Sequence, residues 1–529
     1  MKPSHLRLIV GALLVSALST ASAQEPPRQV NGIDLAQAPH WSRADLDFFL
    51  HGSMSTEVVP EPVLQAFVKT YPDLFPKRDL SNFGLLPDPS AGLPIGFSRR
   101  NVPYLGGMSS VGINCAACHV GEINFSAEDQ PLRVLGMTSH FDAEAFFGAV
   151  AVATWRTSDP ANMKRYLANY LAALDPQGGT TLQDLTAKEL KRQDKEITGA
   201  VADALFGSKG LYNISERDVR FGTGDLEWGR DITPFVSSQL KLFHNMRASL
   251  HIPDQPPTNA PPASGPGRND AFGLLSATLF AAPQPYAPVK YGLVWNLEQR
   301  HWVHWDGNTQ SPLARNLLAA LGLGAPLIGK HGDLDFKLVK RQTDLGELIH
   351  APRYPLNIDE AAAKAGAQHY QARCAACHAG PENDSRLHSV EEIGTDPLRA
   401  QLFTPHQAEL FDKFLAELKV DGYKPPKVPG IRSTQKYWAP TLAGVWARSP
   451  YLHDGSVRTM AELLTTPTER PKSFHRGMHF YDPSVMGYID EGAYLFDTTK
   501  PGNSNSGHNY GTDLSASEKH ELIEYLKTL

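Results

Sequence analysis

The amino-acid sequence predicts a mainly α-helical protein built from two domains, each organised around one copy of a repeated five-residue motif. The first observation is that much of the N-terminal half shows the apolar spacing of helices, with few strand-like alternations. The second is that the pentapeptide CAACH occurs at positions 115–119 and again at 374–378, and these copies contain all four cysteines. The third is that a helical segment runs into the second copy, and an amphipathic segment closes the chain.

The bulk composition is that of an ordinary globular protein. A chain of 529 residues with 41% hydrophobic content can bury a large core, and its length favours two or more domains. The formal net charge is −6 and there is no long basic run, so nothing in the charge pattern points to nucleic acid as a partner.

The first 23 residues have the layout of a secretory signal. Lys2 and Arg7 precede an apolar run from Leu8 to Leu18, and small residues up to Ala23 follow. The apolar run is too short to cross a bilayer comfortably, which argues against a membrane anchor. We therefore expect cleavage after Ala23 and a mature protein, without a membrane span, that is periplasmic or secreted.

The helices expected in the first domain follow from apolar periodicity. They cover 45–50, 60–75, 141–157, 162–174, 182–205 and 234–250, with a Pro/Gly-rich loop at 86–107 leading to the first motif. Residues 253–269 are rich in proline and glycine and predict an extended, exposed connection. The apolar segment 271–280 follows this connection and must also be buried in the core of the first domain, so the connection is a loop within that domain and not a hinge between domains. We therefore place the domain boundary near Arg353, giving domains 24–353, with a helical insertion, and 354–529.

The spacing inside CAACH decides among the uses of its cysteines. An exported protein invites disulfides, but in each copy a histidine directly follows Cys-x-x-Cys, as in c-type haem attachment. Two zinc knuckles would lie closer together and would not need these histidines. A thioredoxin-type pair would sit in a strand-helix-strand context, which neither copy shows. The sequence thus predicts two covalently attached haem c groups.

If each motif attaches one haem, its two cysteines and its histidine each have a defined role. Cysteines at i and i+3 lie on one side of a helical turn, so Cys115 with Cys118, and Cys374 with Cys377, can reach both vinyl groups of one porphyrin. The next residue turns its imidazole under the iron, which makes His119 and His378 the proximal ligands. All four cysteines are then used, and no disulfide remains.

The second domain looks like a class I cytochrome c unit. A helix expected from about Asn357 runs into CAACH, and the chain ends in LSASEKHELIEYLKTL. There Ser515 and Glu518 form a capping box, and Leu522, Ile523, Leu526 and Leu529 form one apolar stripe. The domain is long for such a unit, so we expect extra loops around the haem edge between 423 and 507.

Several further stretches carry a resemblance to a known family. They are GLPIGF (92–97), GINCAACHVGEI (112–123), GPGRNDAFG (265–273), WDGNTQSPLARNL (305–317), LAGVWARSPYLHDGSV (442–457) and PGNSNSGHNYGTDLS (501–515). Together with both CAACH copies, they make the chain resemble the dihaem cytochrome c peroxidase superfamily, which includes MauG-type enzymes, and most of all its rubber-oxygenase-like branch.

The resemblance implies two class I-like cytochrome domains packed face to face. It implies a reactive N-terminal haem, with peroxide or dioxygen at its open position, and a six-coordinate C-terminal haem that stores or relays electrons. The segment between the two motifs is longer here than in peroxidase relatives, which leaves the substrate of the first haem open.

The second haem needs a sixth ligand if it transfers electrons, and class I domains take one from the loop before the last helix. The side chains available there are His453, Met460, His475, Met478, His479, Met486 and His508. We favour His508, which lies in a glycine-rich loop and matches the distal histidine that the resemblance implies. Met478 or Met460 is the alternative, with His508 as a surface residue; His453 would brace a turn or a haem propionate.

Candidate catalytic groups for the first haem lie in EQRHWVHWD, residues 298–306. Glu298, His301 or His304 could donate a proton during O–O cleavage, and Trp302 and Trp305 could wall the pocket or carry an electron. From these we select Glu298, Trp302 and His304 as catalytic residues. The alternative is that the aromatic residues are simply core. His51 or His140 could instead ligate the first iron and close it.

Two functions follow from these assignments. The first is a periplasmic dihaem oxidoreductase that activates peroxide or dioxygen at the N-terminal haem, with a periplasmic electron-transfer protein as possible partner. A peroxidase would need an external electron donor, whereas a dioxygenase would consume oxygen without one. The second is a non-catalytic electron-transfer dihaem cytochrome c with both irons six-coordinate.

Overall fold

The structure is a computed structural model. It describes residues 29–102, 105, 107–174, 220–221, 224–225, 233–253, 256–257, 263–282, 286–326, 334–381, 383–425 and 430–529. The expected signal segment 1–23 and the expected helix 182–205 lie outside these ranges. No helix among the described residues is long and apolar enough to cross a bilayer.

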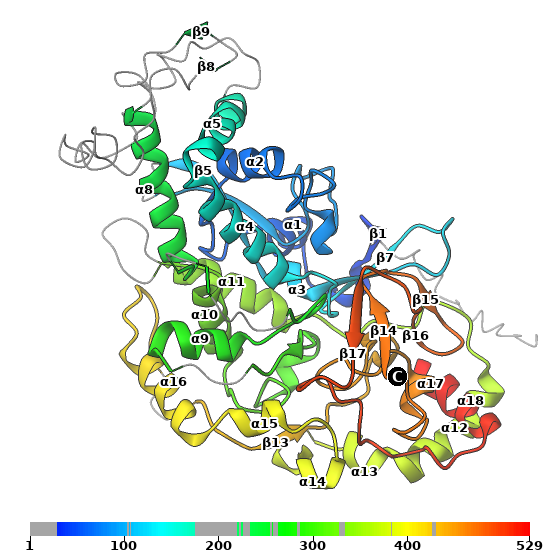
Figure 1. Ribbon diagram of the computed structural model, residues 1–529. Coiled ribbons are helices and arrows are strands. Elements are labelled where there is room, and N and C mark those ends of the chain that lie inside the picture. The colour runs from blue at the N-terminus through cyan, green and yellow to red at the C-terminus, as the bar shows by residue number, and fades with distance from the viewer. Residues whose placement is uncertain are drawn as a thin grey trace, which may run out of the picture.

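The helices and strands of the described residues are short and numerous (Figure 1). The helices are α1 (Arg43–His51), α2 (Glu61–Thr70), α3 (Cys115–His119), α4 (Ala143–Thr157), α5 (Pro160–Leu174), α8 (Thr233–Ser249), α9 (Ala271–Phe280), α10 (Pro312–Gly322), α11 (Phe336–Glu347), α12 (Glu360–Arg373), α13 (Ala375–His378), α14 (Val390–Ile393), α15 (Leu398–Leu402), α16 (Pro405–Glu417), α17 (Met460–Leu463) and α18 (Ala516–Lys527). The 3-10 turns are Leu35–Gln37, Ser81–Phe83, Leu297–Gln299, Asp384–Arg386 and Val445–Arg448.

The strands form several small sheets. They are β1 (Gln29–Val30), β2 (Ile33–Asp34), β3 (Val59–Pro60), β4 (Phe97–Val102), β5 (Met108–Ile113), β6 (Val120–Ile123), β7 (Leu132–Leu135), β8 (Arg220–Phe221), β9 (Gly224–Asp225), β10 (Arg268–Asn269), β11 (Val289–Lys290), β12 (Leu387–Ser389), β13 (Lys436–Trp438), β14 (Ser473–Arg476), β15 (Tyr481–Asp482), β16 (Gly487–Tyr488) and β17 (Tyr494–Asp497). Among them are a four-stranded sheet in the order β1-β2-β7-β6 and a three-stranded sheet in the order β3-β5-β4.

The prediction of a mainly α fold is wrong. About 41% of the described residues are helical and about 14% are in strands, so the protein is a mixture of helices and small sheets. The clearest error concerns the stretch 86–107, which was predicted to be a loop. It contains β4, which pairs antiparallel with β5 from Phe97 opposite Ile113 to Val102 opposite Met108. Short strands of this kind are stabilised by cross-strand contacts rather than by local propensity, so a helix-period analysis does not find them.

The expected helices that fall within the described residues are confirmed. The predicted segments 45–50, 60–75, 141–157, 162–174 and 234–250 correspond to α1, α2, α4, α5 and α8, and the apolar segment 271–280 forms α9. The connection 253–269 is only partly as expected. Ser264 and Arg268 are 2% and 0% exposed, so its described C-terminal end is buried and not an exposed linker.

The second motif lies beside a close helix pair, as the sequence indicates. Ser515 accepts a hydrogen bond from Glu518 N, and the Glu518 side chain caps Ser515 in return, so the predicted capping box is confirmed. Helix α18 packs against α12, which ends where α13 and its motif begin. A Cβ atom at Gly366 would lie 1.9 Å from the Glu521 carbonyl oxygen, so this crossing requires glycine.

This close approach predicts a large difference between two Gly-to-Ala substitutions. Gly366→Ala should lower the free energy of unfolding by about 2 kcal/mol or more, because α12 and α18 must move apart. Gly148→Ala is the matched control in α4, since a Cβ atom there meets nothing within 4 Å. It should be neutral or stabilise by up to about 1 kcal/mol. Chemical denaturation measures both, and equal effects would contradict the packing described for α12 and α18.

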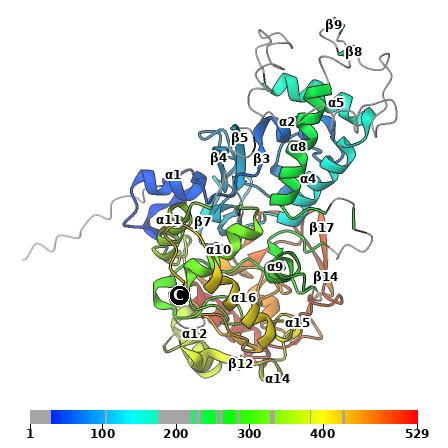
Figure 2. The same ribbon diagram turned by 90° about the vertical axis from the view of Figure 1, so that its left-hand side faces the viewer.

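One hydrophobic core draws on both ends of the chain. It joins residues from the N-terminal sheet and α1, such as Ile33 and Phe49, to residues near the C-terminus, such as Trp446 and Leu522. A second core lies between α2, α4, α5 and β3–β5. These elements lie together in the upper part of Figure 1 and again in the upper part of Figure 2. The boundary at Arg353 stays a prediction, and side chains from both sides of it share the first of these cores.

Candidate functional site

The first CAACH motif is a single helical turn, α3, between strands β5 and β6. The Asn114 side chain caps this turn by accepting a hydrogen bond from Ala116 N at 2.9 Å, and its amide donates to the Gly52 carbonyl oxygen at 2.9 Å. Gly96 has a φ of +87°, and a Cβ atom there would lie 2.1 Å from Ala117 N. The turn is therefore fixed from both sides, and a residue larger than glycine at position 96 would displace it.

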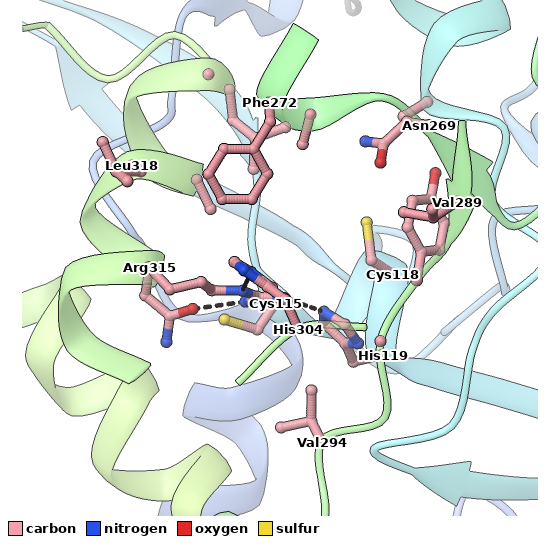
Figure 3. Close-up of a pocket in the computed structure, with 18 of the residues that line it drawn as sticks. Cys115, Cys118, His119, Asn269, Phe272, Val289, Val294, His304, Arg315 and Leu318 are labelled. Carbon is pink, nitrogen blue, oxygen red and sulfur yellow. Dashed lines mark hydrogen bonds between the residues drawn. The ribbon is translucent and has the colours of Figure 1, made fainter. Parts of the chain in front are cut away.

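Both cysteines and the histidine of this motif open into one cavity of about 980 Å³. Its walls come from α3, α9, α10 and α11 and from the segments 286–305 and 438–440. Figure 3 shows Cys118 and His119 on the right and Arg315 on the left, with Cys115 and His304 between them and Phe272 above. A pocket of this size that is mainly lined by apolar and aromatic side chains is typical of a cofactor or ligand site.

Arg315 connects two imidazoles inside the cavity. Its Nη2 donates to His119 Nε2 at 3.3 Å, and its Nε donates to His304 Nε2 at 3.3 Å. His304 Nδ1 lies 2.6 Å from Asn308 Oδ1, an atom that can only accept. The proton of His304 is therefore assigned to Nδ1, which leaves Nε2 as an acceptor.

The two histidines are neutral in this environment. Burial, together with the nearby charge of Arg315, lowers the pKa of His119 to about 3 and that of His304 to about 3. Burial also raises the pKa of Cys115 to about 11 and that of Cys118 to about 12, which disfavours a reactive thiolate of the thioredoxin type. A neutral imidazole with its Nε2 lone pair turned into the cavity is the form that binds a metal. The residues present therefore fit a haem attached at this motif.

The catalytic candidates of the segment 298–306 do not all reach the cavity. His304 and Trp305 line it, and the Trp305 indole donates to the Lys290 carbonyl oxygen at 3.0 Å. Glu298 and His301 are exposed, and neither is part of the cavity wall. Trp302 is half-buried away from that wall, with the Arg432 guanidinium 3.6 Å from its ring centre.

The two histidines considered as closing ligands lie elsewhere. His51 places Nδ1 3.2 Å from the Phe97 carbonyl oxygen and Nε2 3.1 Å from Asp88, so both of its ring nitrogens have partners. His140 stacks on His479, with ring centres 4.6 Å apart. Neither His51 nor His140 belongs to the cavity wall.

The second CAACH motif places His378 opposite His508. His378 Nδ1 donates to the Pro440 carbonyl oxygen at 2.7 Å, which leaves Nε2 free of the proton. This arrangement is common for metal-binding histidines, because the second hydrogen bond fixes the tautomer and the ring orientation. The ring centres of His378 and His508 are 6.2 Å apart.

This separation fits one metal ion between two imidazoles. A metal–nitrogen bond of about 2 Å on each side, with about 1 Å from nitrogen to ring centre, places the two ring centres about 6 Å apart. Burial lowers the pKa of His378 to about 4 and that of His508 to about 3, so both rings are neutral. The residues at the second motif therefore fit a haem with two imidazole ligands.

The loop that carries His508 is held by Arg470. This buried guanidinium donates to the carbonyl oxygens of Asn505 at 2.6 Å, Gly507 at 2.8 Å and His508 at 3.3 Å. The methionines considered as alternative ligands lie in other surroundings. Met478 is 39% exposed, and Met460 packs in the core shared by the two ends of the chain.

The other uses of the four cysteines find no support in the geometry. All four have free thiols, so none forms a disulfide. Among the described residues, no group of three or more His, Cys, Asp or Glu side chains is arranged to hold a metal ion on its own.

One comparison with known proteins, a match to a family model, points to haem chemistry. The family described as RoxA-like, cytochrome c-like matches residues 436–475. This segment contains β13 and the PYLHDGS stretch but neither CAACH copy. A cytochrome c-like domain implies covalently bound haem c and is consistent with a haem-dependent oxidoreductase. Domains of this kind typically lie outside the cytoplasm.

Two proteins of Sinorhizobium fredii (strain NBRC 101917 / NGR234) are similar over longer ranges. The uncharacterized protein y4iJ is 27% identical over 597 aligned residues, which cover 93% of this chain and 92% of y4iJ. The uncharacterized protein y4iM is 28% identical over 320 residues, which cover 52% of this chain and 72% of y4iM.

Sequence reasoning missed Arg315 and Arg470. Arg315 lies within the stretch 305–317 that carried the family resemblance, but an arginine on a helix is ordinarily a surface residue. The sequence carried a partial indication that this helix is buried, because residues 317–321 are all apolar. The structure shows that most of the helix is buried. No local signal marks Arg470, whose partners in the His508 loop lie 35 to 38 positions away in the chain.

Proposed function

We propose that this protein is an exported dihaem c-type oxidoreductase that activates peroxide or dioxygen at the N-terminal haem. The observation that carries this proposal is the contrast between the two motifs. His378 faces a second imidazole, that of His508, whereas His119 faces a cavity of about 980 Å³ that contains Arg315. One site suits electron storage and transfer, and the other leaves room for a small oxidant beside the metal.

At the first site Cys115 and Cys118 would hold the haem and His119 would ligate its iron. The haem supplies one-electron chemistry and a position that a small oxidant can reach. Arg315 contributes a permanent positive charge and several N–H donors inside the cavity, because guanidinium remains protonated. Such donors stabilise negative charge that develops on oxygen, and they act strongly in a site with little water.

His304 completes the proton chemistry of the first site. Its Nε2 is an acceptor and its Nδ1 is hydrogen-bonded to Asn308. The neutral ring can therefore accept the proton that a peroxide releases and later return it from the same nitrogen. The proposal assigns this role to His304 rather than to Glu298, which is exposed, and gives no catalytic role to Trp302, which is covered by Arg432.

At the second site Cys374 and Cys377 would hold the haem, with His378 and His508 as its axial ligands. Two imidazole ligands leave no position for an oxidant, so this haem would supply or store electrons. Its source of electrons would be an electron-transfer protein of the periplasm, or of the medium if the protein is secreted.

A specific observation also favours the electron-carrier alternative. His304 faces the same cavity as His119, with its Nε2 turned toward Arg315. If His304 ligated the first iron in place of an oxidant, both haems would be six-coordinate and the protein would carry electrons only.

Carbon monoxide binding to the reduced protein tests the proposal. One equivalent of carbon monoxide per chain is expected, with the haem of the second motif unchanged. Turnover then separates the reactions. A peroxidase consumes hydrogen peroxide only with a reduced donor, whereas a dioxygenase consumes oxygen with an unsaturated substrate and no donor. If the reduced protein bound no carbon monoxide and consumed neither oxidant, the carrier alternative would replace the proposal.

A further inference from the structure

A second polar site lies outside both CAACH environments, around Arg476 at the end of β14. This side chain is 5% exposed, and among the described residues neither Nη1 nor Nη2 has a hydrogen-bond partner. The Phe496 ring lies on one side, with its centre 5.2 Å from the guanidinium carbon. The charged end of Arg476 is thus buried with both terminal nitrogens unmatched.

Two glycines lie beside these nitrogens. A Cβ atom at Gly455 would lie 3.4 Å from Arg476 Nη1 and 3.6 Å from Nη2, and one at Gly267 would lie 3.5 Å from Nη2. Gly455 and Gly267 have φ values of +68° and +76°, which disfavour larger residues there. The guanidinium is therefore bordered by two positions that lack side chains, and we call the space between Gly267, Gly455 and the two nitrogens the recess.

Basic groups outnumber acidic groups around the recess. The charges of Arg268 and Lys290 act on the same region as Arg476, and burial together with neighbouring positive charge lowers the pKa of both Lys290 and Arg476. Arg268 and Lys290 have carbonyl partners: Arg268 donates to Pro288 and Gly502, and Lys290 donates to Arg448 and Pro450. Arg476 is the member of this group whose terminal nitrogens lack such partners.

The nearest acids do not neutralise Arg476. Asp454, adjacent to Gly455, is fully buried, and its Oδ2 has no partner among the described residues. Burial raises the pKa of Asp454 to about 6, and its carboxyl group makes no hydrogen bond to the terminal nitrogens of Arg476. Asp142 uses Oδ1 to cap α4 by accepting from Ala145 N at 2.9 Å. An unmatched donor and an unmatched acceptor thus lie near each other without pairing.

Leaving a buried guanidinium unmatched is expensive. A buried polar group without a hydrogen bond costs about 1–3 kcal/mol, and an unpaired charge costs more. Guanidinium groups pair best with flat anions that accept two parallel hydrogen bonds, above all carboxylates. Lys290 connects the recess with the first cavity, because its Cβ atom would lie 3.7 Å from a Cβ atom at Gly455 and it also belongs to the wall of that cavity.

We propose that the recess between Gly267 and Gly455 binds one carboxylate-like anion, held by the two terminal nitrogens of Arg476. Two sources have this chemistry. One is a propionate of the haem attached at Cys115 and Cys118, a source that rests on the proposed function. The other is a free anion such as formate or chloride, a source that does not.

The test compares the purified holoprotein with Arg476→Gln and with Arg476→Lys, which keeps the charge but loses the paired donors. Arg341→Gln is the matched control, because Arg341 also lies over an aromatic ring, that of Phe48, but its side chain is 48% exposed. Thermal unfolding is followed in sodium formate and in sodium chloride at constant ionic strength. The midpoint potential of each haem and the propionate bands in the resonance Raman spectrum are also measured.

Each source predicts its own result. If a propionate fills the recess, the wild type does not respond to formate or chloride. Arg476→Gln then lowers the midpoint potential of one haem and shifts its propionate bands, because the negative charge loses its partner. If a free anion fills it, formate or chloride raises the unfolding temperature of the wild type but not that of Arg476→Gln. Arg476→Lys should show a smaller change in the same direction, and Arg341→Gln none.

The anion site is overturned if the wild type ignores both anions and Arg476→Gln leaves both potentials and the propionate bands unchanged. Should Arg476→Gln fail to fold, Arg476→Lys decides the matter by the same measurements. The alkaline pyridine spectrum of the same samples reports haem content. Protein without haem would contradict the proposed function, whereas the formate and chloride titrations would still test the anion site.

Discussion

Replacing His508 with alanine should abolish the low-spin signal of one haem and leave the haem content unchanged. His508 faces His378 with 6.2 Å between ring centres, so this substitution removes the imidazole proposed as the second ligand. An iron that loses a strong axial imidazole changes to the high-spin form or takes up water. Electron paramagnetic resonance of the ferric protein measures the change, with the alkaline pyridine spectrum as the measure of haem content.

His475→Ala is the control for this substitution. His475 lies on β14, where its ring is paired with Asp490 and half-exposed. Its loss should leave both haem signals as in the wild type. Met460→Leu and Met478→Leu address the alternative ligands directly. A normal low-spin signal in His508→Ala, or its disappearance in either methionine variant, would show that His508 is not the sixth ligand.

Arg315→Leu should lower kcat/KM for the activated oxidant by about 10²–10³, which corresponds to about 3 kcal/mol of lost transition-state stabilisation. Arg315 is the buried cation that donates toward both His119 and His304 in the first cavity. Leucine keeps much of the side-chain volume but removes the charge and all donors. Steady-state kinetics with hydrogen peroxide or dioxygen measure the effect, according to which oxidant the wild type uses.

Two further variants separate catalysis from folding. Arg43→Leu removes an exposed arginine that pairs with Asp47 on α1, and should leave kcat/KM unchanged. Arg315→Lys keeps a charge without the planar fork and should restore only part of the activity. If Arg315→Leu kept kcat/KM within about threefold of the wild type while binding both haems, Arg315 would act in structure alone.

The sequence was most informative where chemistry and spacing coincide. The distance between the two cysteines of each motif, and the histidine after them, predicted where the two candidate sites lie. The glycine-rich loop before the last helix led to His508, which the structure places opposite His378. The helices were recognisable because their apolar period is local, and the Ser515 capping box marked the start of α18.

Features that depend on distant contacts could not be predicted in the same way. Strand β4 was interpreted as loop because its pairing with β5 decides its conformation. Arg315 gains its place in the cavity from the packing of α10 against α9 and α11, and one of its partners, His119, lies 196 positions away in the chain. The segment 298–306 contained suitable residue types throughout, but only the backbone path decides that His304 faces the cavity while Glu298 faces solvent.

The most direct test of the account is the spin state of the iron in the ferric protein as purified. Electron paramagnetic resonance, with haem content measured on the same sample, counts high-spin and low-spin haems without any knowledge of the substrate. The account predicts two haems per chain, one high-spin at His119 and one low-spin between His378 and His508. Two low-spin haems, neither of which changes on reduction and addition of carbon monoxide, would contradict it.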